Sequence, residues 1–407
     1  MSGPAATHSQ TAPLRVAFVI RELPLGGTTT FCLFLGAALR ARGVDARVFS
    51  FFAHNPLRRE FEEARIPLHL EDAKHGIYED RLVGLYAALR AFAPHAVFAV
   101  MGAESFEVLR YVPSGVLRVG MVHDHTEEVY QTVARYLPWM DQITVDCSPC
   151  LAETRRRFAD KPSANLLLGV RLAPGRRLRA AHPDAPLRLL YFGRLQESQK
   201  RVRLFPAIWR ELKRRGLRFQ WTIHGEGPEK PWLAEQLAEP LAKGEVVFSA
   251  PVLHDLLPEV IRAHDLFLLT SAHEGGPQTL LEAMGYGLVP VCSDIPCLVR
   301  DVVRPETGFK VSLGDVAAYG DAVEQLDKDR GRLEAMSAAA VLAVEAEFTD
   351  QALGERYLTW LRERLPAATP AEWPERIEPQ AVLNFGSPWR FAAFTRPARR
   401  LWKRLRH

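Results

Sequence analysis

Two glutamates in the second half of the chain, Glu274 and Glu282, enclose a Gly-Gly-Pro turn and the start of an apolar run. The run predicts a helix, and a helix N-terminus favours an anion because free N–H groups and the helix dipole point at it. A carboxylate near an anion is repelled unless it accepts hydrogen bonds, which sugar hydroxyls can donate. The stretch therefore suits a diphosphate, with a hexose at Glu274 and a ribose at Glu282.

Two cationic side chains precede this stretch. Arg194 directly follows a predicted strand, and Lys200 lies six residues further on. Arginine binds phosphate oxygens with a planar fork and lysine acts as a point charge, so the two would neutralise a diphosphate. Glycine loops at the ends of strands are expected to bind the same ligand, although each also fits a plain turn. These loops all belong to the predicted second domain and contribute Gly193, Gly225, Glu226, Gly227, Gly275, Gly276 and Pro277.

The elements that must position these residues alternate between apolar strands and amphipathic helices, which predicts βαβ units and parallel sheets. Strands are expected at 14–20, 46–52, 95–101, 115–123, 141–147, 187–193, 218–225, 246–250, 265–271 and 288–293. Helices are expected at 30–42, 80–92, 202–215, 255–263, 278–287 and 350–365, and another from near Pro149. The fold class is α/β, with two doubly wound, Rossmann-like domains in tandem. Ligands of such sheets bind beyond the carboxyl ends of the strands.

A length of 407 residues suits two domains. A segment with three prolines and no apolar periodicity predicts the linker between them, and a Pro-rich stretch precedes the basic end of the chain. The predicted division is a disordered N-terminus at 1–13, an N-terminal domain at 14–172, a linker at 173–186, a C-terminal domain at 187–349, a helix at 350–365 that packs back on the first domain, and a tail at 366–407.

Over about residues 14–365 the chain resembles the retaining GT-B glycosyltransferases of glycosyltransferase family 4. The resemblance is carried by the E-x7-E spacing of Glu274 and Glu282, the GR…K pair, the GEGP loop and EGGPQTLLEAMGYGLVPV. The segment LLLGVRLAP is similar to the family's PNGVD without its Pro-Asn and Asp, and Arg201 stands where glycine is usual. The resemblance implies a GT-B fold, in which two Rossmann-like domains face a cleft.

The resemblance also implies an activity, which is retaining transfer of a hexose from a nucleotide-diphosphate sugar to a glycan or lipid-linked acceptor. The C-terminal domain would bind this donor and the N-terminal domain the acceptor, without cofactor or metal. Glu274, Arg194 and Lys200 would be catalytic, together with His123 near the transferred sugar. His125 is an alternative to His123. The Gly26–Gly27 loop would lie near the donor phosphates.

Composition narrows the classes of protein to which the chain could belong. A net charge of +4 gives no sign of nucleic-acid binding, and five cysteines in this length argue against a disulfide framework. Cys147 and Cys150 form a CxxC that is expected to be reduced and structural, with redox or metal binding as alternatives. No signal peptide or apolar run of membrane-spanning length is visible, so the chain is expected in the cytoplasm.

The end of the chain, residues 386–407, holds seven Lys or Arg, no Asp or Glu, and interleaved aromatic residues. It is expected either to be solvated or to bind an anionic membrane surface as an amphipathic helix, with nucleic acid as a third alternative. Membrane binding would suit peripheral attachment to the inner face of a membrane and synthesis of cell-surface polysaccharide or lipopolysaccharide. Two other functions stay open, a sugar-nucleotide epimerase of the same fold and a non-catalytic binding partner.

Overall fold

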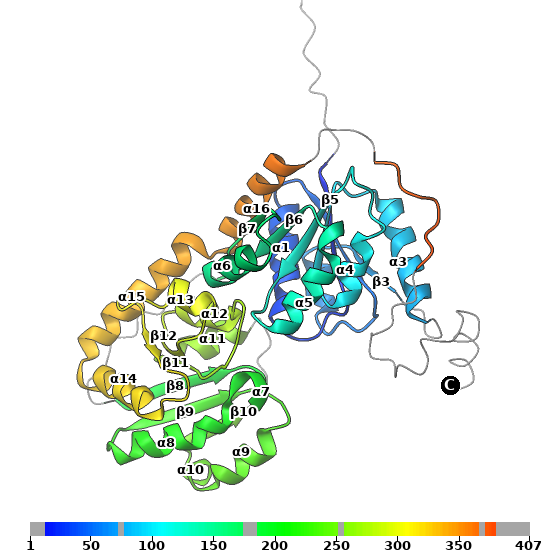
Figure 1. Ribbon diagram of the computed structural model, residues 1–407. Coiled ribbons are helices and arrows are strands. Elements are labelled where there is room, and N and C mark those ends of the chain that lie inside the picture. The colour runs from blue at the N-terminus through cyan, green and yellow to red at the C-terminus, as the bar shows by residue number, and fades with distance from the viewer. Residues whose placement is uncertain (1–12, 72–76, 174–184, 251–255, 366–370, 380–407) are drawn as a thin grey trace, which may run out of the picture.

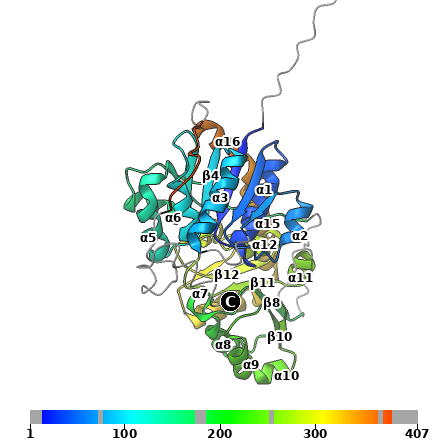
Figure 2. The ribbon, with the colours of Figure 1, turned by 90° about the vertical axis from the view of Figure 1, so that its right-hand side faces the viewer.

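A computed structural model describes residues 13–71, 77–173, 185–250, 256–365 and 371–379 of the chain. They form two α/β domains, one above the other, and α12 (Gln278–Gly285) lies at the boundary between them (Figures 1 and 2). Nearly all of the predicted linker, the first twelve residues and the basic end of the chain lie outside the described residues. No helix in the part that is described is long and apolar enough to cross a bilayer.

The N-terminal domain contains a seven-stranded sheet in the order β3-β2-β1-β4-β5-β6-β7. Every neighbouring pair is parallel. The strands are β1 (Arg15–Ile20), β2 (Asp45–Ser50), β3 (Leu68–Leu70), β4 (Ala96–Met101), β5 (Leu117–Val122), β6 (Gln142–Val145) and β7 (Ser163–Asn165). The order reverses between β1 and β4, which is where a doubly wound sheet opens a crevice for a ligand.

The C-terminal domain contains a six-stranded sheet in the order β10-β9-β8-β11-β12-β13, again entirely parallel. Its strands are β8 (Leu187–Phe192), β9 (Phe219–His224), β10 (Val246–Ser249), β11 (Leu266–Leu269), β12 (Val289–Ser293) and β13 (Phe309–Val311). Here the order reverses between β8 and β11. Each domain is therefore doubly wound, and the predicted fold class is confirmed.

Helices cover both faces of each sheet (Figure 1). Those of the first domain are α1 (Gly27–Arg40), α2 (Arg58–Glu63), α3 (Tyr78–Phe92), α4 (Ala103–Leu109), α5 (Glu127–Tyr136), η1 (Leu137–Trp139) and α6 (Ser148–Arg157). From the second domain onward they are α7 (Glu197–Lys200), η2 (Val202–Leu204), α8 (Phe205–Arg214), α9 (Lys230–Gln236), α10 (Ala238–Ala242), α11 (Leu257–Arg262), α12, α13 (Leu298–Val302), α14 (Val316–Lys328), α15 (Arg330–Glu347) and α16 (Asp350–Arg364).

All ten predicted strands are present, because strands buried on both faces read as continuous apolar runs. Three strands were not predicted, namely β3, β7 and β13. Each has three residues and lies at an edge of its sheet, too short for a periodic signal. The predicted helix 202–215 is instead η2 followed by α8. Arg201 adopts a left-handed conformation, with φ of 49°, between α7 and η2, and Pro206 lies in the first turn of α8.

The last helix, α16, returns to the N-terminal domain and packs against α1 (Figure 1). A Cβ added to Gly354 would come within 2.7 Å of the Ala38 Cβ, so the crossing requires a glycine. Nearby, the Tyr357 ring lies 6.1 Å from the rings of both Phe31 and Phe98. The chain thus crosses between the domains twice, and the second crossing adds to the hydrophobic core beneath the first sheet.

The Pro-rich segment 371–379 continues along α3 of the N-terminal domain (Figure 1). Its Trp373 ring packs 5.8 Å from Tyr86, whose hydroxyl donates a hydrogen bond of 2.8 Å to the Pro374 carbonyl. Arg90 donates to the next carbonyl along the chain, that of Glu375. This part of the predicted tail is therefore bound to the domain surface.

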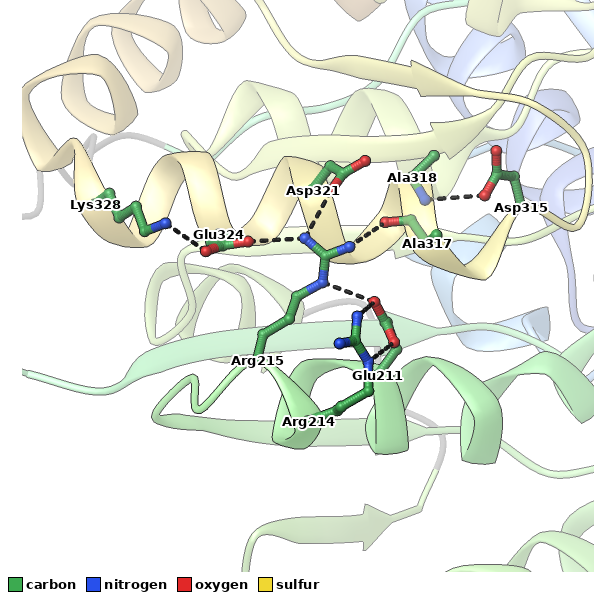
Figure 3. Close-up of polar contacts among 9 residues, drawn as sticks. All are labelled: Glu211, Arg214, Arg215, Asp315, Ala317, Ala318, Asp321, Glu324 and Lys328. Atoms are coloured by element: carbon green, nitrogen blue, oxygen red, sulfur yellow. Dashed lines mark hydrogen bonds and ion pairs between the residues drawn. The ribbon is translucent and has the colours of Figure 1, made fainter.

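Far from the domain boundary, a network of ion pairs joins α8 to α14 (Figure 3). The Arg215 guanidinium lies 2.6 Å from Asp321, 2.8 Å from Glu324 and 2.8 Å from Glu211. It also donates a hydrogen bond to the Ala317 carbonyl. One arginine thus connects two helices on the same face of the C-terminal sheet.

Candidate active site

A cleft of about 1160 Å³ lies between the domains and is lined by both. Its walls include loops that follow β1 and β4 in the first domain and β8 and β11 in the second. Because these are the strand pairs at which each sheet order reverses, the two expected ligand crevices face one another across a single space. The predicted site residues line this cleft, with the exception of Gly227.

Glu274 lies in the loop after β11 and is 7% exposed. The Ser271 hydroxyl donates to its Oε1 over 2.7 Å, and Gln199 Nε2 lies 3.4 Å from Oε2. The Lys200 ammonium at the end of α7 forms an ion pair with Oε1. Ammonium, hydroxyl and amide donors therefore fix the carboxylate at the edge of the cleft.

The two predicted cations differ in their surroundings. Lys200 is 14% exposed and already paired with Glu274, so a bound phosphate would have to share its ammonium. Arg194 follows β8 and is exposed, and among the described residues its side chain makes a single 3.4 Å hydrogen bond, to the Gln196 side chain. Its guanidinium lies 4.0 Å from the position of a Cβ added to Gly26, across the cleft. Arg194 is thus available to an anion beside the N-terminal glycine loop.

The glycines after Glu274 are needed for the contact between the domains. A Cβ at Gly275 would come within 2.0 Å of the His123 carbonyl oxygen, and one at Gly276 within 2.1 Å of Leu168 Cδ1. His123 and Leu168 both belong to the first domain. A larger residue at 275 would therefore push the domains apart, because it meets backbone, whereas at 276 it would first displace the Leu168 side chain.

The GEGP loop packs against the β8–α7 loop in a similar way. A Cβ at Gly225 would lie 2.0 Å from the Gly193 carbonyl oxygen, and one at Gly227 would lie 2.2 Å from the Leu195 carbonyl oxygen. The Glu226 carboxylate lies 2.5 Å from the Lys230 ammonium. Gly193, Gly225 and Glu226 reach the cleft, whereas Gly227 serves the packing of the loop behind it.

Glu282 lies on α12 and lines the cleft. It is 7% exposed, and no side-chain hydrogen bond or ion pair joins it to the described residues. Burial raises the pKa of the Glu282 carboxyl to about 7, because the charged form loses its hydration. A ligand hydroxyl that donated to this carboxylate would favour the charged form.

His123 directly follows β5 and lines the cleft, with its Nδ1 3.2 Å from Asp146 Oδ2. Its ring packs 4.7 Å from that of Phe31, and Nε2 has no hydrogen-bond partner among the described residues. The Asp146 carboxylate favours the tautomer with hydrogen on Nδ1, which leaves Nε2 as an acceptor. His125 points elsewhere, since its Nδ1 contacts the Tyr130 hydroxyl at 3.0 Å and it does not line the cleft.

The CxxC pair, Cys147 and Cys150, lies beside His125. The Cys147 sulfur caps α6 by accepting a hydrogen bond from the backbone of Cys150, and both thiols are buried. Ligand atoms of Asp146, Cys147 and Cys150 lie within 4.8 Å of one another. The hydrogen bond with Cys147, followed by burial, raises the pKa of the Cys150 thiol well above its usual range. A protonated thiol is a poor ligand and nucleophile, which favours the structural alternative.

Several residues of the cleft were missed by the sequence analysis. Asp146 follows β6, the neighbour of β5, so the rule about carboxyl ends of strands could have found it. Asp124 and His273 meet across the domain boundary, with Oδ1 3.4 Å from Nδ1. Gln199 and Gln278 carry no charge, so neither was singled out, although Gln278 lies within the EGGPQ stretch.

Comparison with known proteins identifies the second domain. Residues 186–329 match the family model described as glycosyl transferases group 1. The chain is 34% identical over 153 residues to the lipopolysaccharide 1,6-galactosyltransferase of Salmonella typhimurium, covering 36% of this chain and 40% of the relative. It is 28% identical over 180 residues to the alpha-D-kanosaminyltransferase of Streptomyces kanamyceticus, covering 44% and 46%. The chain thus spans less than half the length of these curated relatives.

Solved structures match nearly the whole chain. The apo lipopolysaccharide outer core galactosyltransferase WaaB has a TM-score of 0.66 at 18% identity and covers 86% of this chain and 100% of its own. Sucrose-phosphate synthase from Thermosynechococcus elongatus has a TM-score of 0.70 at 17% identity, covering 86% and 98%. At these identities the similarity establishes the fold, which is GT-B. The C-terminal domain of this GT-B chain matches the glycosyl transferases group 1 family.

Proposed function

We propose that this protein is a retaining glycosyltransferase that moves a hexose from a nucleotide-diphosphate sugar to a glycan or lipid-linked acceptor. The observation that carries the proposal is the convergence of Arg194, Glu274 with Lys200, Glu282 and His123 on one interdomain cleft. This set combines cations for a diphosphate with carboxylates and an imidazole for sugar hydroxyls. The relatives that act on lipopolysaccharide support a role in cell-surface polysaccharide or lipopolysaccharide synthesis.

The donor would bind along α12. Ribose hydroxyls would donate to Glu282, and the diphosphate would lie at the N-termini of α1 and α12 beside Arg194. The transferred hexose would then reach Glu274, and one of its hydroxyls would donate to His123 Nε2. This order follows from three positions: Glu282 lies within α12, the Gly26–Gly27 loop lies beside the N-terminus of α12, and Glu274 comes just before α12 in the chain.

The reaction breaks the bond between the anomeric carbon and the phosphate oxygen. Arg194, Lys200 and the two helix N-termini stabilise the negative charge that develops on the leaving diphosphate. The acceptor hydroxyl attacks the anomeric carbon from the face that the diphosphate leaves, so the configuration is retained. Its proton passes to the departing phosphate oxygen, which lies on the same face. Cationic side chains would supply the charge stabilisation for which other enzymes use a metal ion.

A panel of UDP, GDP, ADP, TDP and CDP tests the donor site, by thermal shift and calorimetry on the wild type, Arg194→Ala and Glu282→Ala. Stabilisation by one diphosphate, weakened in both variants, is the expected result. A folded wild type that binds none of the five would contradict the proposal. Incubation with the matching sugar nucleotide, without acceptor, separates the alternatives, because an epimerase would convert the sugar and a transferase would leave it unchanged.

The proposed site of action is the cytoplasmic face of a membrane, reached through the basic residues 386–407. Polybasic segments gain about 1 kcal/mol per charge near anionic lipid. Sedimentation with anionic and with neutral liposomes, for the full chain and for a chain that ends at residue 379, tests this. We expect only the full chain to sediment, and only with anionic liposomes. If both chains stay in the supernatant, this part of the proposal fails.

A further inference from the structure

Gln278 is the first residue of α12 and lines the cleft, where it is 6% exposed. Its Oε1 lies 3.6 Å from the position of a Cβ added to Gly27, the first residue of α1. Its Nε2 is buried and has no hydrogen-bond partner among the described residues. The side chain therefore lies between the glycine loops of the two domains, with an amide donor that the protein itself does not satisfy.

A buried donor without a partner is unfavourable, and nearly all such groups in folded proteins are paired with protein, water or ligand. The surroundings of Gln278 indicate which partner is missing. The N-termini of α1 and α12 and the guanidinium of Arg194, 4.0 Å from the added Cβ at Gly26, all favour an anionic oxygen. Either orientation of the amide leaves its NH₂ group to donate, so this conclusion does not depend on which end is nitrogen.

We propose that Gln278 is a donor-binding residue whose amide donates a hydrogen bond to a phosphate oxygen of the nucleotide sugar. This inference rests on the proposed function and adds to it a ligand contact that couples the domains. Gln278 belongs to the second domain and touches the glycine loop of the first. A phosphate bound by its amide would be enclosed by both loops at once, so diphosphate binding would favour the closed arrangement.

The variants Gln278→Met and Gln278→Glu test the contact in the full chain. Methionine keeps the length and loses the donor, whereas glutamate keeps the shape and places a negative charge against the phosphate. Gln220→Met, on the exposed face of β9 away from the cleft, is the matched control. The probes are UDP, GDP, ADP, TDP and CDP, together with the nucleoside of whichever binds tightest.

We expect Gln278→Met to weaken the diphosphate about tenfold or more, and Gln278→Glu to weaken it further, because hydrogen bonds to charged groups are the stronger ones. The nucleoside, which lacks phosphates, should bind wild type and variants equally, and Gln220→Met should bind like the wild type. Gln278→Asn, which keeps an amide but withdraws it, should also weaken the diphosphate. If the Gln278→Met variant does not fold, the diphosphate affinity of Gln278→Asn tests the contact in its place.

The possible failures are distinguishable. If the wild type binds one diphosphate and all three Gln278 variants bind it equally, the contact does not exist and the proposed function stands. Loss of thermal stability with unchanged diphosphate affinity would likewise make Gln278 a packing residue only. An equal loss of affinity for nucleoside and diphosphate would move the contact away from the phosphates. If the wild type binds none of the five, the proposed function fails and this inference fails with it.

Discussion

The two walls of the cleft are built differently. The C-terminal wall holds the charges assigned to the donor, namely Arg194, the Lys200–Glu274 pair and Glu282, and we call it the charged wall. The N-terminal wall also bears acidic side chains such as Asp146, but its part in the proposed site is the His123 imidazole and close backbone approaches, and we call it the shaped wall. In the proposed reaction the first wall would hold the diphosphate sugar and the second would complete the site when the domains meet. The charged wall would bind the ligand through the chemical types of its side chains, whereas the contact between the domains depends on their shapes.

Breaking the charged wall should have the largest effect on sugar transfer. Glu274→Ala leaves the Lys200 ammonium buried without its carboxylate, and removing one partner of a buried pair costs about 3 kcal/mol of unfolding free energy. Transfer should fall by about a hundredfold or more, because the site loses both the carboxylate and the position of the cation. Chemical denaturation and a single-turnover transfer assay measure the two effects.

The control for this variant is Glu63→Ala on α2. Glu63 pairs with Arg59 in solvent, where the two side chains are 58% and 84% exposed. Exposed pairs contribute little to stability, so both unfolding and transfer should stay near wild type. Similar destabilisation in Glu63→Ala and Glu274→Ala would mean that burial does not distinguish the two pairs. Wild-type transfer by Glu274→Ala would favour a non-catalytic binding partner.

Disturbing the N-terminal wall should have the next largest effect. Asp146→Asn replaces the carboxylate that favours hydrogen on His123 Nδ1, so Nε2 would no longer be held as an acceptor for a sugar hydroxyl. We expect transfer to fall about tenfold, while the affinity for the diphosphate alone stays unchanged. Measuring kcat and KM separately from diphosphate affinity tests this. An equal loss of diphosphate affinity would place His123 on the phosphate rather than the sugar.

The difference between the walls also explains what could be predicted from the sequence. The sequence alone suggested four charged side chains that line the cleft, Arg194, Lys200, Glu274 and Glu282, whereas Asp124 and Asp146, which also follow strands, were missed. The need for glycine at 275 depends on a carbonyl that lies more than 150 residues away in the chain. Contacts of that kind have no local signature, and so the domain interface could not be foreseen.

The same physical reasons separate the parts of the fold that could be predicted from those that could not. Central strands such as β1 and β8 were predicted because burial on both faces makes them continuously apolar. The two glutamines of the cleft, Gln199 and Gln278, were missed. Gln278 becomes informative only when its unsatisfied nitrogen is seen beside Gly27. A sequence shows which groups can bind a ligand, whereas the structure shows which groups lack a partner.

Glu282 gives a smaller effect that depends on pH. The folded pKa of about 7 lies above the ordinary value of 4.5, so the folded state holds a proton that the unfolded state would release between these values. The contribution of this group to stability therefore falls as pH rises from about 4.5 to about 7. Glu282→Gln removes this penalty and should be up to about 3 kcal/mol more stable than wild type at pH 8, without ligand.

Denaturation curves of wild type and Glu282→Gln across this pH range check the prediction through their difference, which cancels other titrating groups. The difference should shrink toward zero near pH 4. Because the glutamine cannot become a carboxylate, the variant should also bind the diphosphate several-fold more weakly than wild type at pH 8. A difference in unfolding free energy that is constant with pH would show that Glu282 does not titrate as its burial implies.

The smallest effect on transfer should come from the ion network outside the cleft. Arg215→Met removes the guanidinium that joins α8 to Asp321 and Glu324 of α14 (Figure 3). These carboxylates are partly solvated, so their loss of a partner should lower the melting temperature by only a few degrees, and high salt should narrow the gap to wild type. Transfer and diphosphate affinity should be unchanged. If transfer fell as much as is expected for Asp146→Asn, charges outside the cleft would also contribute to transfer, and assigning the effect of charge to the charged wall alone would be wrong.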